Sequence, residues 1–350
     1  MSEAQPPAPP PSSHGRPKGI KLALQGGGSH GAFTWGVLDR LLEDERLEIE
    51  AISGTSAGAM NAAVLASGHA SGDRQGARAA LDAFWGEIGR EATWSLIQRT
   101  PLDRLFGNWR IDNSPGYIAM DMLGRVFSPY QLPDGLNPLK DVLEKAVDFD
   151  AIRYACRIGL HIGATSVRTG KVKVFENREV CIEAVLASAC LPFLFRAVEV
   201  KGEAYYDGGY VGNPAIWPLI YAPGSRDIVI VQVNPVFREA VPTTAREIQD
   251  RVNEITFNSS LIAEMRAINF VNRLIAGGKL DPSEYRHTNM HLIDGTDVMV
   301  DLHASTKLNA EPEFLTYLKG LGRTAADKWL EQDFDKIGAA GTCNIAQQYL

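Results

Sequence analysis

Short apolar runs alternate with longer amphipathic segments over most of the chain. The runs "IKLAL" (20–24) and "LEIEAIS" (47–53) alternate as half-buried strands do, and the segment 32–42 between them has helical periodicity. Two strands joined by one crossover helix lie parallel in one sheet. The pattern therefore predicts a β-α-β unit at the start of an α/β domain.

The same alternation continues towards the C-terminus. Further strands are predicted at 157–167, 171–176, 227–235 and 290–294, and two more within 195–209 around a Lys201-Gly202 turn. Further helices are predicted at 57–68, 75–90, 139–146, 181–192, 244–276 and 312–332. The apolar run at 227–235 is typical of a central parallel strand. We expect an α/β fold with a mostly parallel central sheet flanked by helices.

The predicted elements fall into one domain. Residues 1–18, rich in proline and serine, are expected to be a disordered tail, and 19–350 a single domain with a helical C-terminal extension at 244–350. The stretch 93–138 looks irregular but is rich in apolar and aromatic residues. It is either a packed insertion or a lid over the substrate. The apolar stripe of 244–276 favours the core or an oligomer interface over a membrane surface.

Composition narrows the class of protein. The net charge of −7 argues against nucleic-acid binding, and four scattered cysteines are typical of reduced thiols in the cytoplasm. No apolar signal segment is seen at the N-terminus, and the uncharged stretch 51–72 is too rich in glycine and polar residues to predict a membrane span. A cytoplasmic globular protein is expected.

A serine between glycines follows the second predicted strand directly. Gly54-Thr55-Ser56-Ala57-Gly58 fits G-x-S-x-G between a strand and a helix, the context in which this motif carries a nucleophile. Small neighbours permit a sharp turn, and the helix N-terminus adds partial positive charge. We expect a nucleophile elbow after the second strand, with Ser56 activated, rather than a plain turn with an N-capping serine.

The first strand runs into another glycine turn. Gly26, Gly28 and Gly31 fit the dinucleotide fingerprint G-x-G-x-x-G, but the serine turn occupies the place where such sites need an acidic residue. No Walker-type phosphate loop occurs. Both turns follow the carboxyl ends of neighbouring strands. We therefore expect Gly26, Gly27 and Gly28 to present backbone N–H groups beside the serine as an oxyanion hole.

Two arrangements could remove the serine proton. A Ser-His-Asp triad would combine Asp207 with His287, His291 or His303, but the serine turn comes earlier along the chain than in α/β-hydrolases. Alternatively, Asp207 acts alone from the tripeptide DGG that follows a short strand. Burial would raise its pKa and make it a stronger base. The carboxylate alone is the preferred prediction.

Three motifs in this order resemble the patatin-like phospholipase family. They are GGGSHG at 26–31, GTSAG at 54–58, and Asp207-Gly208-Gly209, and "ASACLPFLF" (187–195) is also similar to a segment that these proteins share. The resemblance spans about residues 19–235. It implies a parallel-sheet α/β fold, hydrolysis of lipid acyl esters by a Ser-Asp dyad, and no metal or other cofactor.

By position, the resemblance assigns Ser56 as the nucleophile, Asp207 as its base and the loop 26–28 as the oxyanion hole. The chain departs from the family at one place. Where the family usually has arginine or lysine before the last glycine of the first motif, this chain has His30. The fixed positive charge that the family places near the oxyanion is therefore missing from this position.

The leading hypothesis is a serine lipid acyl hydrolase, a phospholipase A or carboxylester hydrolase that works through an acyl-enzyme. Its partners would be a lipid or acyl-ester substrate, with peripheral contact to a membrane or lipid granule, and a second copy of the chain. The same dyad would serve an intracellular polyhydroxyalkanoate depolymerase or a short-chain carboxylesterase. A catalytically silent lipid-binding protein is the third hypothesis, and the intact motifs disfavour it.

Overall fold

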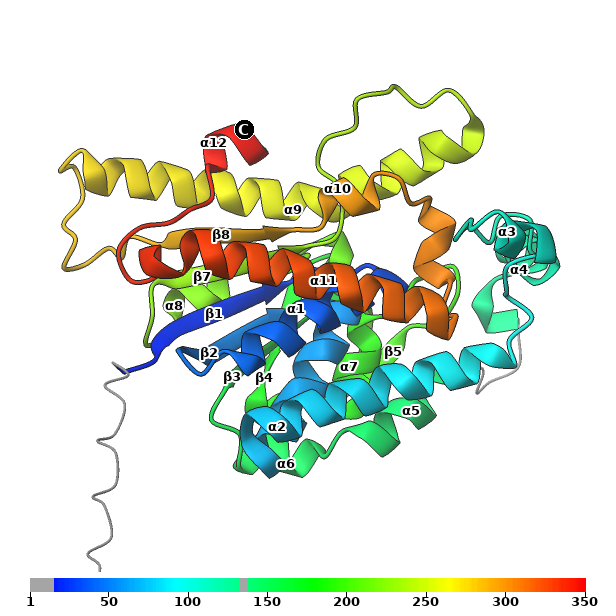
Figure 1. Ribbon diagram of the computed structural model, residues 1–350, viewed down its shortest axis with the longest axis horizontal. Coiled ribbons are helices and arrows are strands. Elements are labelled where there is room, and N and C mark those ends of the chain that lie inside the picture. Colours follow the sequence, from blue (N-terminus) through cyan, green and yellow to red (C-terminus); the bar gives the residue numbers. More distant parts are fainter. Residues whose placement is uncertain (1–15, 132–137) are drawn as a thin grey trace, which may run out of the picture.

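A central sheet lies between two layers of helices in the computed structural model, which describes residues 16–131 and 138–350 (Figure 1). The predicted tail falls mostly on residues 1–15, outside the described part of the chain, and the first strand already begins at Lys18. The predicted lid, 93–138, is described except for 132–137.

Eight strands form one sheet in the order β5-β6-β3-β2-β1-β7-β8, with β4 also paired to β3. The strands are β1 (Lys18–Leu24), β2 (Leu47–Gly54), β3 (Gly159–Ser166), β4 (Val172–Glu176), β5 (Val198–Val200), β6 (Glu203–Asp207), β7 (Asp227–Gln232) and β8 (Asn289–Asp294). The strands β3, β2, β1, β7 and β8 pair in parallel, whereas β4, β5 and β6 pair antiparallel. The predicted α/β fold with a mostly parallel sheet is confirmed.

The described residues form helices on both faces of this sheet and beyond its edge (Figure 1). They are α1 (Gly31–Glu43), α2 (Ala57–Thr93), α3 (Pro101–Leu105), α4 (Pro115–Val126), α5 (Pro138–Ala146), α6 (Phe149–Tyr154), α7 (Ile182–Ser188), α8 (Trp217–Tyr221), α9 (Ala245–Ala276), α10 (Thr296–Met299), α11 (Pro312–Asp333) and α12 (Ile345–Tyr349). In Figure 1, α9 and α12 lie on one side of the sheet, and α1, α2 and α11 on the other.

The alternation along β1 explains the two layers. Leu22 and Leu24 point into the core shared with α1, α2 and α11, and Ala23 points into the core under α8 and α9. Lys21 also faces α8, where its buried Nζ donates to the carbonyl oxygens of Leu219 (2.8 Å) and Ala222 (2.6 Å). These bonds satisfy carbonyl groups of α8 that have no partner within the helix.

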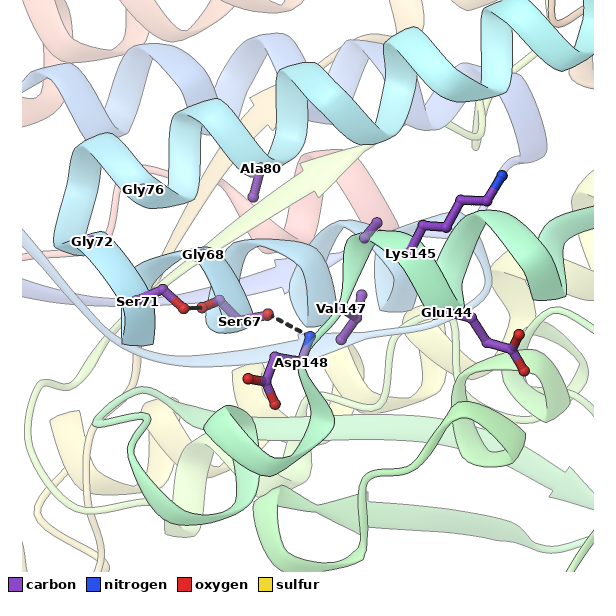
Figure 2. Close-up of a pocket in the computed structure, with 11 residues that line it drawn as sticks. Ser67, Gly68, Ser71, Gly72, Gly76, Ala80, Glu144, Lys145, Val147 and Asp148 are labelled. Carbon is purple, nitrogen blue, oxygen red and sulfur yellow. Dashed lines mark hydrogen bonds between the residues drawn. The ribbon is translucent and has the colours of Figure 1, made fainter.

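The helix α2 is two segments rather than one. The chain doubles back at Gly72 and Asp73, where φ is −160° and 49°. Figure 2 shows the two segments facing α5 across a hollow of about 540 Å³ that Gly68, Gly76 and Lys145 help to line. None of the predicted catalytic residues lines this hollow.

The region 93–138 is more regular than its sequence suggests, because it contains α3 and α4. Both helices begin with proline at an N-terminal position, and the Thr100 side chain caps α3 by accepting from Asp103 N–H. Thr100-Pro101 and Ser114-Pro115 are recognisable helix-start signals. The prediction of an irregular segment was wrong here because the helices are too short to show clear periodicity.

The region 244–350 is not purely helical, because it supplies β8, which pairs with β7 and completes the sheet. Its long helix α9 begins with a capping box between Thr244 and Glu247. The apolar stripe predicted on α9 is buried only in part: Leu261, Met265 and Ile268 lie in the core, whereas Ile248, Val252 and Ile255 are about half exposed.

Helices α1 and α11 cross in close contact because a glycine of each helix lies at the crossing. A Cβ on Gly36 would collide with the Lys319 carbonyl oxygen, and one on Gly322 with the Phe33 carbonyl oxygen. A Cβ on Gly320, on the same helix as Gly322, would meet open space.

Gly322→Ala is therefore expected to lower the free energy of unfolding by about 1–3 kcal/mol, because the added methyl group pushes α11 away from α1. Gly320→Ala, the matched control, is expected to raise it by up to about 1 kcal/mol through the loss of backbone entropy in the unfolded chain. Urea denaturation followed by circular dichroism measures both. Equal stability of the two variants would contradict the close crossing.

Candidate active site

The register of the sheet brings the three motifs to one edge. Leu24, at the end of β1, is paired with Gly54, at the end of β2, so the glycine turn and the serine turn leave the sheet side by side. Gly54 is in turn paired with Ile162 of β3, and two residues further along β3, Ala164 is paired with Asp207 of β6. Asp207 is thus level with the turn that carries Ser56.

The backbone at Ser56 is strained. Its φ of 55° and ψ of −123° lie in a region that residues with a side chain rarely adopt. Its N–H donates to Ser188 Oγ (2.9 Å), and the Ser188 hydroxyl donates to the Gly163 carbonyl oxygen (2.6 Å). The Ser56 side chain makes no capping hydrogen bond to α2, so the alternative of an N-capping serine fails. Strain of this kind is held at functional sites by the surrounding structure.

Asp207 is fully buried, and its surroundings fix its position. Its N–H donates to the Cys190 carbonyl oxygen (2.8 Å), and its own carbonyl oxygen accepts from Thr165 Oγ1 (2.7 Å). The carboxylate oxygen Oδ1 accepts from Gly209 N–H (2.7 Å). The other oxygen, Oδ2, has no partner of regular geometry among the described residues, although the Ser56 hydroxyl is near enough to affect the carboxyl group.

Burial raises the pKa of Asp207 to about 7. The cause is desolvation, which disfavours the charged carboxylate. The hydrogen bond from Gly209 N–H, the nearby Ser56 hydroxyl and the charge of Lys307 lower the pKa by smaller amounts. An ordinary aspartate with a pKa near 3.9 would be a weak base at neutral pH. The pKa of Asp207 lies close to neutral pH, which suits a general base.

The glycine turn lies against Ser56. A Cβ on Gly26 would stand 2.6 Å from Ser56 Cβ, so only glycine allows this approach. The Gly26 N–H donates to Asn213 Oδ1 (2.7 Å), so it is already occupied and departs from the prediction of three free donors. Among the described residues, none accepts a hydrogen bond from Gly27 or Gly28 N–H. These two N–H groups are the candidate donors to an oxyanion.

The other motif glycines allow close packing around the site. Gly31 lets α1 approach Ala57 at the start of α2, and Gly58 lets α2 approach the Leu24 carbonyl oxygen. Gly54, Gly208 and Gly209 would likewise be crowded by any side chain. Gly209 contacts Phe257, so α9 forms part of the wall behind Asp207.

His30 is neutral and buried. Its Nε2 lies 2.7 Å from Thr306 Oγ1, and the Thr306 hydroxyl already donates its only hydrogen to the His303 carbonyl oxygen (2.6 Å), so Nε2 must donate. Nδ1 then has no proton and no partner among the described residues. Desolvation, with smaller effects of the Lys307 and Arg238 charges, holds the pKa of His30 well below its usual value. His30 therefore provides no positive charge at neutral pH.

None of the three histidines considered for a triad has a hydrogen bond to Ser56 or Asp207 among the described residues. His291 Nε2 pairs with Asp227 Oδ1 (3.0 Å) at the start of β7, the opposite edge of the sheet from Ser56. His287 lines a small hollow with Lys21, and the electrostatic neighbours of His303 include Arg110. Among the described groups that shift the pKa of Asp207 there is no imidazole. In residues 16–131 and 138–350, no group of three or more histidine, cysteine or acidic side chains is placed to hold a metal ion.

Four residues of this site were missed by sequence reasoning. Ser188, Asn213, Asn234 and Lys307 support the two turns from distant segments. Ser188 lies inside the noted stretch 187–195, so its neighbourhood was visible. The other three belong to no motif that a single sequence reveals.

Comparisons with known proteins give structural likenesses of low identity. VipD from Legionella pneumophila has 17% identity and a TM-score of 0.41, with 91% of this chain and 67% of VipD covered. For SpcU in complex with ExoU, from the type III secretion system of Pseudomonas aeruginosa, the identity is 15% and the TM-score 0.32, with 87% of this chain and 53% of the matched chain covered. The chain thus spans about half the length of that matched chain.

No curated protein matches the sequence. Among the helices formed by the described residues, none has the length and apolar character that crossing a membrane requires. A family model does match: residues 22–220, more than half of the chain, fit that of the patatin-like phospholipases. The matched span contains both glycine turns, Ser56 and Asp207. The chain therefore belongs to the patatin-like phospholipase family, and phospholipases are enzymes that hydrolyse lipids.

Proposed function

We propose that this protein is a serine hydrolase of fatty-acyl esters in which Asp207 alone activates Ser56. The observation that carries the proposal is a buried carboxyl group, whose Oδ2 has no hydrogen-bond partner among the described residues, beside a serine held at φ 55°. Family membership supports lipid as the source of the ester. The absence of an imidazole among the described groups around Asp207 favours a dyad over a triad.

The reaction follows from these positions. Asp207 accepts the Ser56 proton as Oγ attacks the ester carbonyl carbon, and Gly27 and Gly28 N–H groups stabilise the oxyanion of the tetrahedral intermediate. As the intermediate collapses, the C–O bond to the alcohol breaks and the alcohol leaves with the proton from Asp207. Water then attacks the acyl-Ser56 ester with Asp207 again as base, which releases the fatty acid and restores the serine.

Exposed apolar side chains on α3 and α4 favour an aggregated lipid as the substrate. On α3 and just after it, Leu102, Leu105 and Phe106 are 66–80% exposed, and α4 exposes Met122 and Val126. Such a concentration of exposed apolar residues on two short helices is typical of an interaction surface. We propose that these two helices, named here the apolar helices, contact the lipid surface.

The segment that follows α4 contacts the loop that holds the backbone of Asp207. Arg196 Nε donates to the Pro129 carbonyl oxygen (3.2 Å), and Ala197 N–H donates to the Tyr130 hydroxyl (3.2 Å), so the segment after α4 lies on the loop that follows α7. The same loop contains Cys190, whose carbonyl oxygen binds Asp207 N–H. Lipid contact at the apolar helices would therefore bring an ester close to the site.

Ser56→Ala and Asp207→Asn are each expected to lower ester hydrolysis by at least about 10²-fold, because one removes the nucleophile and the other the base. Asparagine retains the oxygen that accepts from Gly209 N–H, so the fold should persist. The measurement is fatty-acid release from phospholipid vesicles, short p-nitrophenyl esters and polyester granules, which also identifies the preferred ester. His287→Ala and His303→Ala are the controls and should retain most activity. If either histidine variant lost as much activity as Asp207→Asn, a triad would be favoured.

The pH dependence is expected to follow Asp207. Because the carboxyl group must be ionised to accept a proton, kcat/KM should fall as pH decreases through about 7, rather than near 4 as for an exposed aspartate. Glu264→Gln is a matched control, since burial raises the pKa of Glu264 also to about 7, but this carboxylate binds the N–H groups of Ile216 and Trp217 instead. A profile that is flat from pH 5 to 8 would contradict the assignment of Asp207 as base.

Replacing Leu105 and Phe106 together with serine is expected to reduce binding to neutral phosphatidylcholine vesicles about tenfold, because both side chains are largely exposed and available to lipid. Hydrolysis of a soluble short-chain ester should not change. Tyr154→Ser is the matched control, because Tyr154 is 82% exposed on α6, which Figure 1 places far from α3 and α4. Co-sedimentation measures binding, and equal binding of both variants would refute the lipid contact.

A further inference from the structure

A positively charged side chain lies beside residues 26–28, named here the oxyanion loop. This side chain does not belong to the motif GGGSHG that forms the loop. His30 occupies the position where the family usually has a basic residue, and it is neutral and buried. A lysine from a distant segment, Lys307, lies against the same loop instead. It belongs to a 3₁₀ helix, Ala304–Leu308, that packs on the turn Gly28–His30.

Lys307 contacts the loop in two ways. Its carbonyl oxygen is packed so closely on Gly28 that a Cβ there would collide with it, and Gly28 has a φ of 59°. Its Nζ donates to Asn234 Oδ1 (2.8 Å), and Asn234 Nδ2 donates to the Gly26 carbonyl oxygen (2.7 Å). A chain of hydrogen bonds therefore runs from the ammonium group to the oxyanion loop.

The orientation of the Asn234 amide follows from its partners. Its Nδ2 has two acceptors, the Gly26 carbonyl oxygen and Gln25 Oε1 (3.3 Å), and its Oδ1 has the ammonium group as donor. Gln25 Oε1 also accepts from the backbone N–H of Asn234 (2.9 Å), and Gln25 Nε2 donates to Asn258 Oδ1 (3.1 Å). A reversed amide would place donor against donor at Lys307.

The last link in this chain is a single peptide group. The carbonyl of Gly26 and the N–H of Gly27 belong to the same planar, resonant unit. A hydrogen bond accepted by the carbonyl oxygen polarises the unit and makes its N–H a stronger donor, because hydrogen bonds in a chain strengthen one another. The Gly27 N–H is one of the two candidate donors to the oxyanion.

We propose that Lys307 is a positioning residue for ester hydrolysis, whose ammonium charge acts through the Asn234 amide to strengthen the Gly27 N–H as an oxyanion donor. It supplies from the C-terminal part of the chain the positive charge that His30 does not carry. This inference rests on the proposed hydrolase function.

Other charged groups also face Lys307. Glu254 and Asp250, from α9, and Asp207 favour its charged form, whereas burial and Arg238 disfavour it and lower its pKa. Arg238 is itself paired with Glu254 (2.6 Å). Around Asp207, the Gly209 hydrogen bond and the nearby Ser56 hydroxyl remain when Lys307 is replaced, so the loss of the lysine charge should raise the pKa of Asp207 further.

Lys307→Met and Lys307→Gln are the decisive variants, because both remove the charge and glutamine can still donate to Asn234. Each is expected to lower kcat for a soluble p-nitrophenyl ester about tenfold, less than deletion of a whole oxyanion donor, with KM changed less than about twofold. The acid limb of the pH profile should also move to higher pH. Lys307→Arg should restore most of kcat, and Lys279→Met, at an exposed lysine outside the site, should match the wild type.

The connection through Asn234 is tested by a double-mutant cycle. Asn234→Ala alone should lower kcat, and adding Lys307→Met should lower it little further, because both changes break the same chain of hydrogen bonds. Thermal unfolding of each variant separates loss of activity from loss of fold, and if Lys307→Met does not fold, Lys307→Gln and Lys307→Arg decide the question.

Two results would overturn the inference: a raised KM with unchanged kcat, which would make Lys307 a substrate-binding group, or fully additive effects of Lys307→Met and Asn234→Ala. If the charge-removing variants match an active wild type, the role of Lys307 is refuted and the proposed function stands. If the wild type hydrolyses none of the esters tested, the proposed function itself has failed.

Discussion

The burial of Asp207 is the constraint on which the site depends. Its carboxyl group is out of contact with water, with one oxygen held by Gly209 N–H and the other without a hydrogen-bond partner in the described part of the chain, so it resists ionisation and gains basicity. Its position is set by the antiparallel pairing of β6 with β3, which brings the end of β6 level with the serine turn. Were Asp207 exposed, its pKa would return towards 4, and it could not act as a base near neutral pH. Burial thus sets the pKa of this carboxyl group, and no imidazole is among the described groups that shift it.

At Ser56 and the glycine turn, a strained backbone is held in place by contacts from other segments. Ser56 is held at a positive φ by the close packing of both motif turns and by the bond from its N–H to Ser188. The glycine turn is held from behind by Asn213, Asn234 and Lys307. In the proposed reaction, the N–H groups of Gly27 and Gly28, which have no acceptor among the described residues, would bind the oxyanion without reorganisation.

The sequence predicted the parts of this structure that depend on local patterns. The β-α-β unit, the serine turn and the late strand β8 follow from periodicity and turn residues, and Ser56 and Asp207 from motifs with fixed spacing. The short helices α3 and α4 were missed because a helix of one or three turns has too few positions for a clear period, although their proline starts were present. Lys307 and Asn234 could not be found, because only the folded chain brings residues 73 positions apart into contact. The neutral state of His30 likewise depends on burial that no motif encodes.

The central claim is that Ser56, Asp207 and the Gly27–Gly28 amides face one reacting carbonyl group. A crystal structure of the protein inactivated by a fluorophosphonate ester tests it most directly, since the phosphonyl group mimics the tetrahedral intermediate. The account predicts phosphorus bonded to Ser56 Oγ, with the phosphoryl oxygen about 3 Å from both amide nitrogens and Asp207 beside the Ser56 oxygen. A phosphoryl oxygen turned towards solvent, or an adduct on any other residue, would contradict it.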